Sequence, residues 1–393
     1  MKKSYYPLVS GITIVLFICN LVHAQDGPDY KNSKQIEQLF LNDSTQNYQF
    51  AAWAYSFIGE YHKALKTYDK SGGEEPEFPY SDINILSKYQ VRPAVDYIIE
   101  QSKKEKIIII NEAHHQPAHR VFTESLLEGL YKNGYRYLGL ETLAEDSLLN
   151  IRKWPLVNDG YYSREPQFGN MIRKALKIGF TLFCYEDLSD PEGREIGEAK
   201  NIKKIIDKDE RAKILIHCGF GHLLEDYNVE PLRMAGALKK ISGIDPFSID
   251  QVDWTEHSNS AYEARYYQFA QTQYSAVFID TNGNPYNMRR DSSLVDLKVA
   301  HPRTQYISKR PSWLLRNDSW KEYKLDKIKF DINFPCLISA YPIKEDDKAE
   351  SVPIDQIEIN NYGEKSLILP PGTFILPLTD QNGRTQKRQI TVK

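Results

Sequence analysis

Two short segments of the chain gather histidines and carboxylates closely enough to share one chemical task. Residues 111–120 read NEAHHQPAHR, and residues 217–222 read HCGFGH. A histidine beside a carboxylate in a cleft can take a proton from water or give one to a leaving group. The same residue types can hold a divalent metal ion. The chain has no His-Glu-x-x-His motif, so both chemistries stay open, and the serine-hydrolase and phosphate-loop motifs are absent.

For these side chains to meet, the elements before them must bring their ends together. Residues 106–110 (KIIII) form a β-branched run typical of a buried parallel strand. Further strands are predicted at 135–140, 180–185, 213–217, 247–251 and 275–280. Helices are predicted between them at 118–132, 171–177, 194–207, 231–241 and 262–271, with a polar insertion at 144–168. This alternation predicts an α/β fold with a mostly parallel sheet and flanking helices.

In parallel sheets, ligands bind beyond the carboxyl ends of the strands, and the candidate residues follow four such ends. We predict that five of them act in catalysis, namely Glu112, His114, His115, Glu141 and His222. Four more are predicted to contact substrate, namely His119, Arg120, Glu186 and His217. Only one of the two adjacent histidines is expected to face the site, while the other packs away from it.

Several candidates also have a purely structural interpretation. Glu141 ends an apolar strand, where an unpaired carboxylate would be costly to bury. A salt bridge to Arg120 or Arg136 would satisfy it there. Glu186 can cap the following helix, and His119 can be an ordinary packing residue at the start of a helix. The sequence does not decide between these interpretations.

The regions on either side of the α/β pattern have different sequence patterns. Residues 25–103 are mostly helical in pattern, and small and aromatic residues within 51–70 are similar to one tetratricopeptide hairpin. A single unit favours a helical hairpin cap on the next domain. From about residue 320 the helical period disappears, and alternating runs at 328–332, 354–359 and 373–378 predict a small β-sandwich. The predicted domains are therefore 25–103, 104–319 and 320–393.

The first 24 residues are predicted to be a secretory signal peptide. Lys2 and Lys3 precede an apolar stretch at 8–21 that is too short for a comfortable membrane span, and a small residue, Ala24, precedes the expected cleavage point. We expect a periplasmic or secreted protein without a transmembrane span in the mature chain. The alternative is a lipoprotein anchored at Cys19, although Ile18 stands where a small residue is wanted. The formal net charge of −3 gives no basic footprint for nucleic acid.

The motifs resemble those of the erythromycin esterase/ChaN-like superfamily, which includes Tiki- and TraB-type proteins. The likeness rests on NEAHHQPAHR, the following helix, LGLET at 138–142 and KILIHCGFGHLLE at 213–225, and it covers about residues 104–282. The resemblance assigns family roles to Glu112, Glu141 and His222. The esterase pattern matches His115 and the ChaN-type pattern matches His114. Asn111 departs from the family, which usually has glycine there.

The sequence therefore predicts a hydrolase-like protein, esterase- or metalloprotease-like, with a His/Glu site. A divalent metal can assist it, and the ligand is expected to be a small molecule or a peptide. The alternative is a protein that binds haem or another small ligand without turnover, for which Tyr161, Tyr162 and Tyr185 can supply contacts, as the ChaN likeness implies. A third interpretation is a non-catalytic scaffold.

Overall fold

The computed structural model describes residues 30–41, 47–72, 85–145, 148–225, 232–264, 266–267, 270, 272–287, 295–316, 318–326, 328, 330–345 and 350–393. The predicted signal peptide and Cys19 lie outside this range. No helix within the described ranges is both long and apolar enough to cross a membrane.

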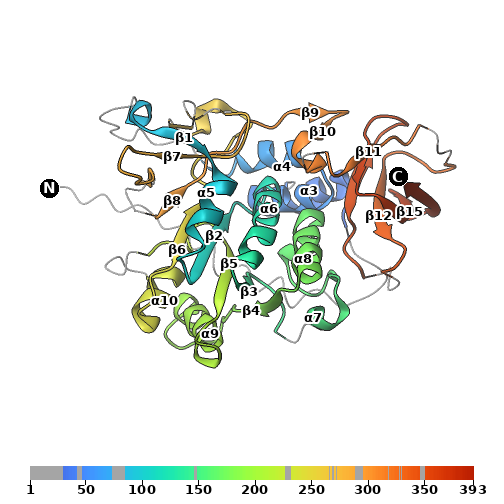
Figure 1. Cartoon of the computed structure of the whole chain (residues 1–393). Helices are drawn as coiled ribbons and strands as arrows, with labels where there is room; N and C mark the ends of the chain where they lie inside the picture. The colour runs from blue at the N-terminus through green and yellow to red at the C-terminus, as the bar shows by residue number, and fades with distance from the viewer. Residues whose placement is uncertain are drawn as a thin grey trace.

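A six-stranded parallel sheet forms the centre of the molecule (Figure 1). In spatial order its strands are β4 (Thr181–Cys184), β3 (Tyr135–Leu140), β5 (Lys213–Gly219), β2 (Ile107–Glu112), β6 (Phe247–Asp250) and β8 (Leu297–Lys298). The predicted α/β class with flanking helices is confirmed. Both faces are covered, so every residue of β2 is buried, as expected for a strand inside a parallel sheet.

The two faces of β2 pack against different helices. Ile108 and Ile110 join the apolar cluster of α6 (Ala118–Lys132), α8 (Pro166–Ile178), α5 (Ala94–Gln101) and α3 (Tyr48–Phe57). Ile107 and Ile109 join the cluster of α9 (Arg194–Lys208) and α10 (Met234–Ser242). Side chains alternate between the faces of a strand, so the KIIII run supplies both cores at once.

The N-terminal part holds α2 (Ser33–Phe40) and the hairpin of α3 and α4 (Tyr61–Tyr68). Its turn lies against the C-terminal region. Gly59 has a φ of +72°, and a Cβ there would lie 2.0 Å from the carbonyl oxygen of Gln356. Only glycine fits this close approach. The short strand β1 (Gln90–Pro93) interrupts the helical texture and pairs antiparallel with β7 (Ala276–Ile279).

The C-terminal region consists of antiparallel sheets that share one apolar core, as predicted. β13 (Asp355–Ile359), β12 (Cys336–Pro342), β15 (Gly372–Asp380) and β16 (Thr385–Val392) form one sheet. β11 (Lys321–Tyr323) pairs with β14 (Leu367–Leu369) to cover the same core. These strands lie beside the hairpin helix α3 at the right of Figure 1.

Three predicted elements differ from the observed ones. The predicted strand at 275–280 exists as β7, but it belongs to the small sheet with β1 rather than to the main sheet. The described residues of 262–271 form no α-helix. Tyr266 and Tyr267 are both buried in one aromatic cluster. At 328–332 no described residue is in a strand, because the Tyr362 hydroxyl bonds the backbone of Phe330 instead.

The α/β region and the C-terminal region are joined by a buried ion pair, which yields a stability test. Arg310 is paired with Asp355, and both side chains are almost fully buried. Removing one partner leaves an uncompensated buried charge, so Asp355→Ala should lower the free energy of unfolding by about 3–5 kcal/mol in urea titrations. The exposed pair of Arg384 and Asp331 is the control, and Asp331→Ala should cost less than about 1 kcal/mol. Equal losses in the two variants would contradict this interpretation.

Candidate functional site

Glu112 at the end of β2 anchors the polar residues at the carboxyl edge of the sheet. Arg120 from the first turn of α6 grips this carboxylate with two hydrogen bonds, from Nε to Oε2 at 2.7 Å and from Nη2 to Oε1 at 2.6 Å. His114 Nδ1 lies 2.9 Å from Oε1, and His217 Nε2 lies 2.8 Å from Oε2. Burial would raise the pKa of Glu112, but the Arg120 guanidinium and these hydrogen bonds hold it well below its usual range. The carboxylate is therefore ionised and fully occupied.

Arg120 itself is fixed from a second side. It is fully buried and donates from Nη1 to Glu165 Oε2 at 3.0 Å and from Nη2 to the His114 carbonyl at 3.0 Å. Glu165 also caps α8 by accepting from the Phe168 backbone N–H at 2.8 Å. A buried arginine shared by two carboxylates couples β2, α6 and α8 into one rigid unit.

His114 is held between aromatic rings. Its ring stacks on Tyr162 with centroids 3.8 Å apart and meets Trp53 and Phe220 edge to face. Because Nδ1 is bonded to Glu112, Nε2 points the other way. A Cβ built on Gly219 would lie 2.5 Å from that nitrogen and 2.9 Å from Glu141 Oε2. The imidazole and the second carboxylate therefore converge over the bare backbone of Gly219.

Glu141 follows β3 and is 6 % exposed. Its Oε1 accepts from Arg194 at 3.0 Å, and within the described ranges its Oε2 has no hydrogen-bond partner. Burial would raise the pKa of this carboxyl, but the charges of His114, His222 and Arg194 hold it below its ordinary value. An ionised carboxylate oxygen without a hydrogen-bond partner is a strong acceptor, and a hydrogen bond from a donor such as water would stabilise it.

His222 lies on the other side of Glu141. Its Nε2 is 3.6 Å from Glu141 Oε1, and its Nδ1 is 2.9 Å from Glu195 Oε2 and 3.6 Å from Glu198 Oε2. Burial would lower its pKa, but these three carboxylates outweigh it and raise the pKa to about 9. The imidazole is thus protonated at neutral pH.

Arg194, at the start of α9, neutralises the remaining carboxylates. It pairs with Glu186 at 2.5 Å and lies 2.8 Å from Glu198. Glu198 is fully buried, and this burial, with the charges of Glu186 and Glu141 beside it, raises its pKa to about 8. The cluster around His222 thus holds four carboxylates, three of which pair with Arg194.

The same cluster contains one group suited to a metal ion. Ligand atoms of Glu195, Glu198 and His222 all lie within 4.8 Å of one another. Two carboxylates and an imidazole are a common donor set for Zn²⁺ or Mn²⁺. With Nδ1 facing the ion, His222 Nε2 would face Glu141, which is the carboxylate–histidine arrangement that orients metal ligands. The residues therefore fit a divalent cation.

They fit haem poorly. A porphyrin needs a broad apolar slot, whereas Glu141, Glu195 and Glu198 surround His222 with charge. Of the tyrosines considered from sequence, Tyr162 is buried against His114, and Tyr185 is buried with its hydroxyl donating to the His217 carbonyl.

The nine candidates are thus divided by the structure. His114, Glu141, Glu186 and His222 converge on one cluster, and Glu112, Arg120 and His217 form the buried layer behind it. His115 points elsewhere and stacks on Tyr68 with centroids 3.6 Å apart. His119 accepts from the Ala113 backbone N–H at 3.0 Å and stacks on His301.

Sequence reasoning missed Arg194, Glu195 and Glu198. They belong to REIGE at the start of α9, which follows the strand end that carries Glu186. Residues i, i+3 and i+4 share one face of a helix, so a search for such a charged face beside a strand end would have found Arg194 and Glu198.

Comparisons with known proteins give no family. No family model matches the chain, and no curated protein does. Among solved structures, the type III effector HopBA1 has 12 % sequence identity and a TM-score of 0.34 over 56 % of this chain and 99 % of that one. RRSP, a MARTX toxin effector domain from Vibrio vulnificus CMCP6, has 15 % identity and a TM-score of 0.29 over 53 % and 50 %.

The bare backbone at Gly219 yields a test of the convergence of His114 and Glu141. Gly219→Ala should lower the free energy of unfolding by about 1–3 kcal/mol through overpacking, because the new Cβ would lie 2.3 Å from His114 Cε1. Gly221→Ala is the control, since its Cβ would meet only Leu224 Cδ1 at 3.8 Å. Urea titrations of both variants measure the difference. A Gly219→Ala variant as stable as the control would show that the two side chains do not meet there.

The buried histidine His301 yields a pH test. Its ring is bonded to Ser275 and Gln251, and burial lowers its pKa to about 4. The unfolded chain, with a pKa near 6.5, then takes up the proton first, so stability falls as pH drops from about 6.5 towards 4. Between pH 6.5 and 5 this residue should account for a loss of about 1.5 kcal/mol.

The variant His301→Gln should lack this part of the slope while keeping similar stability at pH 7.5. Urea titrations of the variant and the parent protein at pH 7.5, 6.5 and 5 measure these stabilities. Identical slopes in the variant and the parent would mean that His301 is not held neutral by burial.

Proposed function

We propose that this protein is a hydrolase in which Glu141 activates a water molecule beside His114, with an ester or amide bond of a small molecule or peptide as its target. The observation that supports the proposal is the ionised, unpartnered Oε2 of Glu141 on the side of His114 Nε2. No direct hydrogen bond to this oxygen occurs among the described residues. The proposed water would bridge these two atoms.

Each residue of the cluster has a role in such a reaction. Glu141 Oε2 accepts a proton from the water, which is general base catalysis, and His114 Nε2 positions the water through a hydrogen bond. Glu112 holds the His114 ring through Nδ1 and fixes its orientation. The protonated His222 stabilises the charge that develops on the attacked carbonyl oxygen or gives its proton to the leaving group.

Arg194 keeps the general base, Glu141, ionised without itself transferring a proton. Its hydrogen bond to Glu141 Oε1 at 3.0 Å occupies one oxygen and favours the ionised carboxylate. The other oxygen then remains available to water. Partial burial of the cluster strengthens all these charge interactions, because they act in a medium of lower dielectric constant.

The direct test is Glu141→Gln, which keeps the shape of the side chain and removes its charge. On p-nitrophenyl esters or fluorogenic peptides that the parent cleaves, kcat should fall at least about a hundredfold, the usual scale of acid–base catalysis. Glu128→Gln, at an exposed surface pair, should keep full activity. Circular dichroism checks that both variants fold. Undiminished turnover by the Glu141→Gln variant would rule out this base and favour a binding protein.

A divalent metal bound by Glu195, Glu198 and His222 is a second candidate for the way this site works. The specific support is the convergence of the three ligand atoms within 4.8 Å. When bound, such an ion supplies a Lewis acid that polarises a carbonyl or lowers the pKa of water. The chain's own contribution is to orient His222 through Glu141.

Calorimetric titration with Zn²⁺ and Mn²⁺ tests this candidate without a substrate. Glu198→Gln should weaken binding by at least about tenfold, because a ligand oxygen loses its charge. Glu192→Gln is the control, since Glu192 is exposed and pairs only at the surface with Lys200. If both variants bind the ion as the parent does, the site is not at this cluster and the metal-free reaction is favoured.

A further inference from the structure

The carbonyl oxygen of a bound ester or amide needs a hydrogen-bond donor of its own. When water adds to the carbonyl carbon, negative charge develops on that oxygen, and a preorganised donor there lowers the barrier. Two donors near Glu141 are already engaged, because Arg194 pairs with three carboxylates and the Tyr185 hydroxyl donates to the His217 carbonyl. His222 can serve the oxygen or the leaving group, but the one ring nitrogen that faces Glu141 cannot serve both at once.

Tyr162 is fixed beside the strand end that carries Glu141. It begins the short 3-10 helix η2 (Tyr162–Arg164) in the segment between β3 and α8. Its backbone N–H donates to the hydroxyl of Thr142 at 3.3 Å, and Thr142 directly follows Glu141 in the chain. Its carbonyl accepts from the backbone N–H of Glu165, the cap of α8, at 3.0 Å. The backbone of Tyr162 is therefore tied both to the end of β3 and to the start of α8.

The ring of Tyr162 covers one face of His114. The centroids of the two rings are 3.8 Å apart, and their planes differ by 17°. His114 Nδ1 is bonded to Glu112, whereas Nε2 lies on the side of Glu141. Of these two carboxylates, Glu141 has the larger effect on the pKa of Tyr162. The Tyr162 hydroxyl therefore lies towards the Nε2 side of the imidazole, which is also the side of the proposed water.

The hydroxyl of Tyr162 is an available donor. Within the part of the chain that the structure describes, Tyr162 makes its hydrogen bonds through its backbone, and its hydroxyl has no partner. The residue is only 6 % exposed, yet its oxygen is not sealed from solvent, in contrast to the unpaired Nε1 of the neighbouring Trp53. Burial and the charge of Glu141 raise the pKa of Tyr162 well above its ordinary value. The hydroxyl therefore keeps its proton at neutral pH and can donate it in a hydrogen bond.

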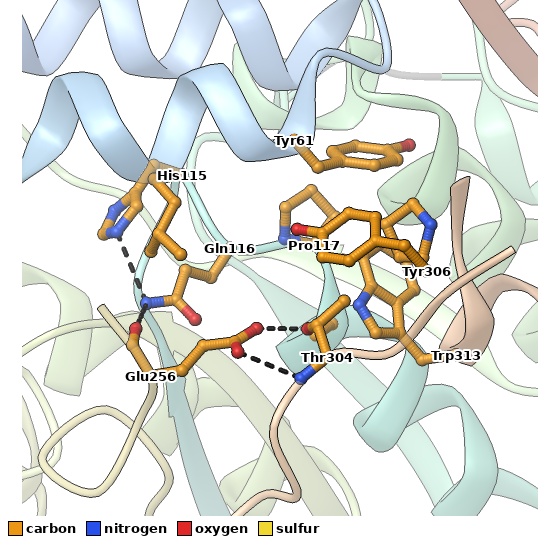
Figure 2. Close-up of a pocket in the computed structure, with 11 residues that line it drawn as sticks. Tyr61, His115, Gln116, Pro117, Glu256, Thr304, Tyr306 and Trp313 are labelled. Atoms are coloured by element: carbon orange, nitrogen blue, oxygen red, sulfur yellow. Dashed lines mark hydrogen bonds between the residues drawn. The ribbon is translucent and has the colours of Figure 1, made fainter. Parts of the chain in front are cut away.

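The pocket on the other side of the loop that follows β2 is too small for a substrate. His115, Gln116 and Glu256 are among the residues that line it (Figure 2). Figure 2 shows the Gln116 amide between the His115 ring and the Glu256 carbonyl, to which it donates at 3.1 Å. The pocket has room for about one water molecule. A carbonyl group is therefore expected on the side of His114 and Tyr162 rather than on the side of His115.

We propose that Tyr162 is a further catalytic residue, whose hydroxyl donates a hydrogen bond to the substrate carbonyl oxygen as negative charge develops on it. This inference rests on the hydrolytic function proposed above. Water adds to the carbonyl carbon as its proton passes to Glu141, and the electron pair of the C=O bond moves to the oxygen beside Tyr162. When this pair returns, the bond to the leaving group breaks and His222 gives that group its proton. Glu141 returns its proton to His222 through solvent, and Tyr162 keeps its own proton throughout.

Tyr162→Phe tests this role, because it keeps the ring that stacks on His114 and removes only the hydroxyl. On the p-nitrophenyl ester that the parent cleaves fastest, kcat should fall about a hundredfold to a thousandfold, the scale for one lost oxyanion donor. KM should change by less than about threefold, because the contact strengthens only in the transition state. Tyr97→Phe is the control and should keep full activity, since Tyr97 of α5 is similarly buried, at 4 % exposed, and its ring lies against the Arg92 side chain.

A thionoester separates this catalytic role from a structural one. Its sulfur replaces the carbonyl oxygen and is a weak hydrogen-bond acceptor. The parent should therefore prefer the oxygen ester, and Tyr162→Phe should reduce that preference at least about tenfold. An unchanged preference in Tyr162→Phe would overturn the assignment even where turnover falls, because structural damage slows both substrates equally. Full turnover by Tyr162→Phe beside an inactive Glu141→Gln would overturn the role of Tyr162 and leave the hydrolase in place. Full turnover by both variants, or no hydrolysis of any p-nitrophenyl ester or fluorogenic peptide by the parent, would overturn both proposals.

Discussion

The buried fork between Arg120 and Glu112 is the interaction on which the candidate site depends. An isolated charge at either position would be prohibitively costly at full burial. Together they satisfy each other, and their remaining hydrogen-bonding capacity is taken up by Glu165, His114 and His217. The direction of the His114 ring, and with it the position of Nε2 relative to Glu141, follows from this pairing. The NEAHHQPAHR motif thus contributes both the supporting pair, Glu112 and Arg120, and the proposed reactive side chain, His114.

The outer part of the site has the opposite character. Around Glu141 and His222 the carboxylates outnumber the cationic groups that lie among them. Bound protons or a metal ion can neutralise the excess negative charge. This crowding of negative charge raises the pKa of both Glu198 and His222. Acid–base pairs with pKa values pushed apart by their surroundings are typical of catalytic clefts. In the proposed reaction, the inner layer orients His114 and the outer layer supplies the groups that transfer protons.

Much of the fold could be predicted because local sequence patterns indicate the strands and helices of the α/β region. The helix at Ala118–Lys132 and the strand at Tyr135–Leu140 have the predicted bounds, since an apolar period marks the helix and the aromatic and apolar residues of YRYLGL mark the strand. The order of strands in the sheet, and the pairing of β7 with β1, depend on long-range packing. No local pattern in residues 275–280 carries that information.

The candidate site divides in the same way. The rule that ligands bind beyond parallel strand ends brought Glu141, His114 and His222 to one edge. It could not separate His114 from His115, because only the contact with Glu112 for the one, and with Tyr68 for the other, sets the two rings apart. Glu195 and Glu198 were missed because their role depends on where α9 packs. Loop geometry and helix packing are decided by the whole chain, and single residues do not reveal them.

The account rests on one water position, and a crystal structure at a resolution that resolves ordered waters tests it most directly. The predicted result at neutral pH is a water within hydrogen-bonding distance of both Glu141 Oε2 and His114 Nε2, with Glu141 Oε1 still bonded to Arg194. A Glu141 carboxylate bonded to protein groups through both oxygens, or a His114 ring turned so that Nε2 faces Glu112, would contradict the account.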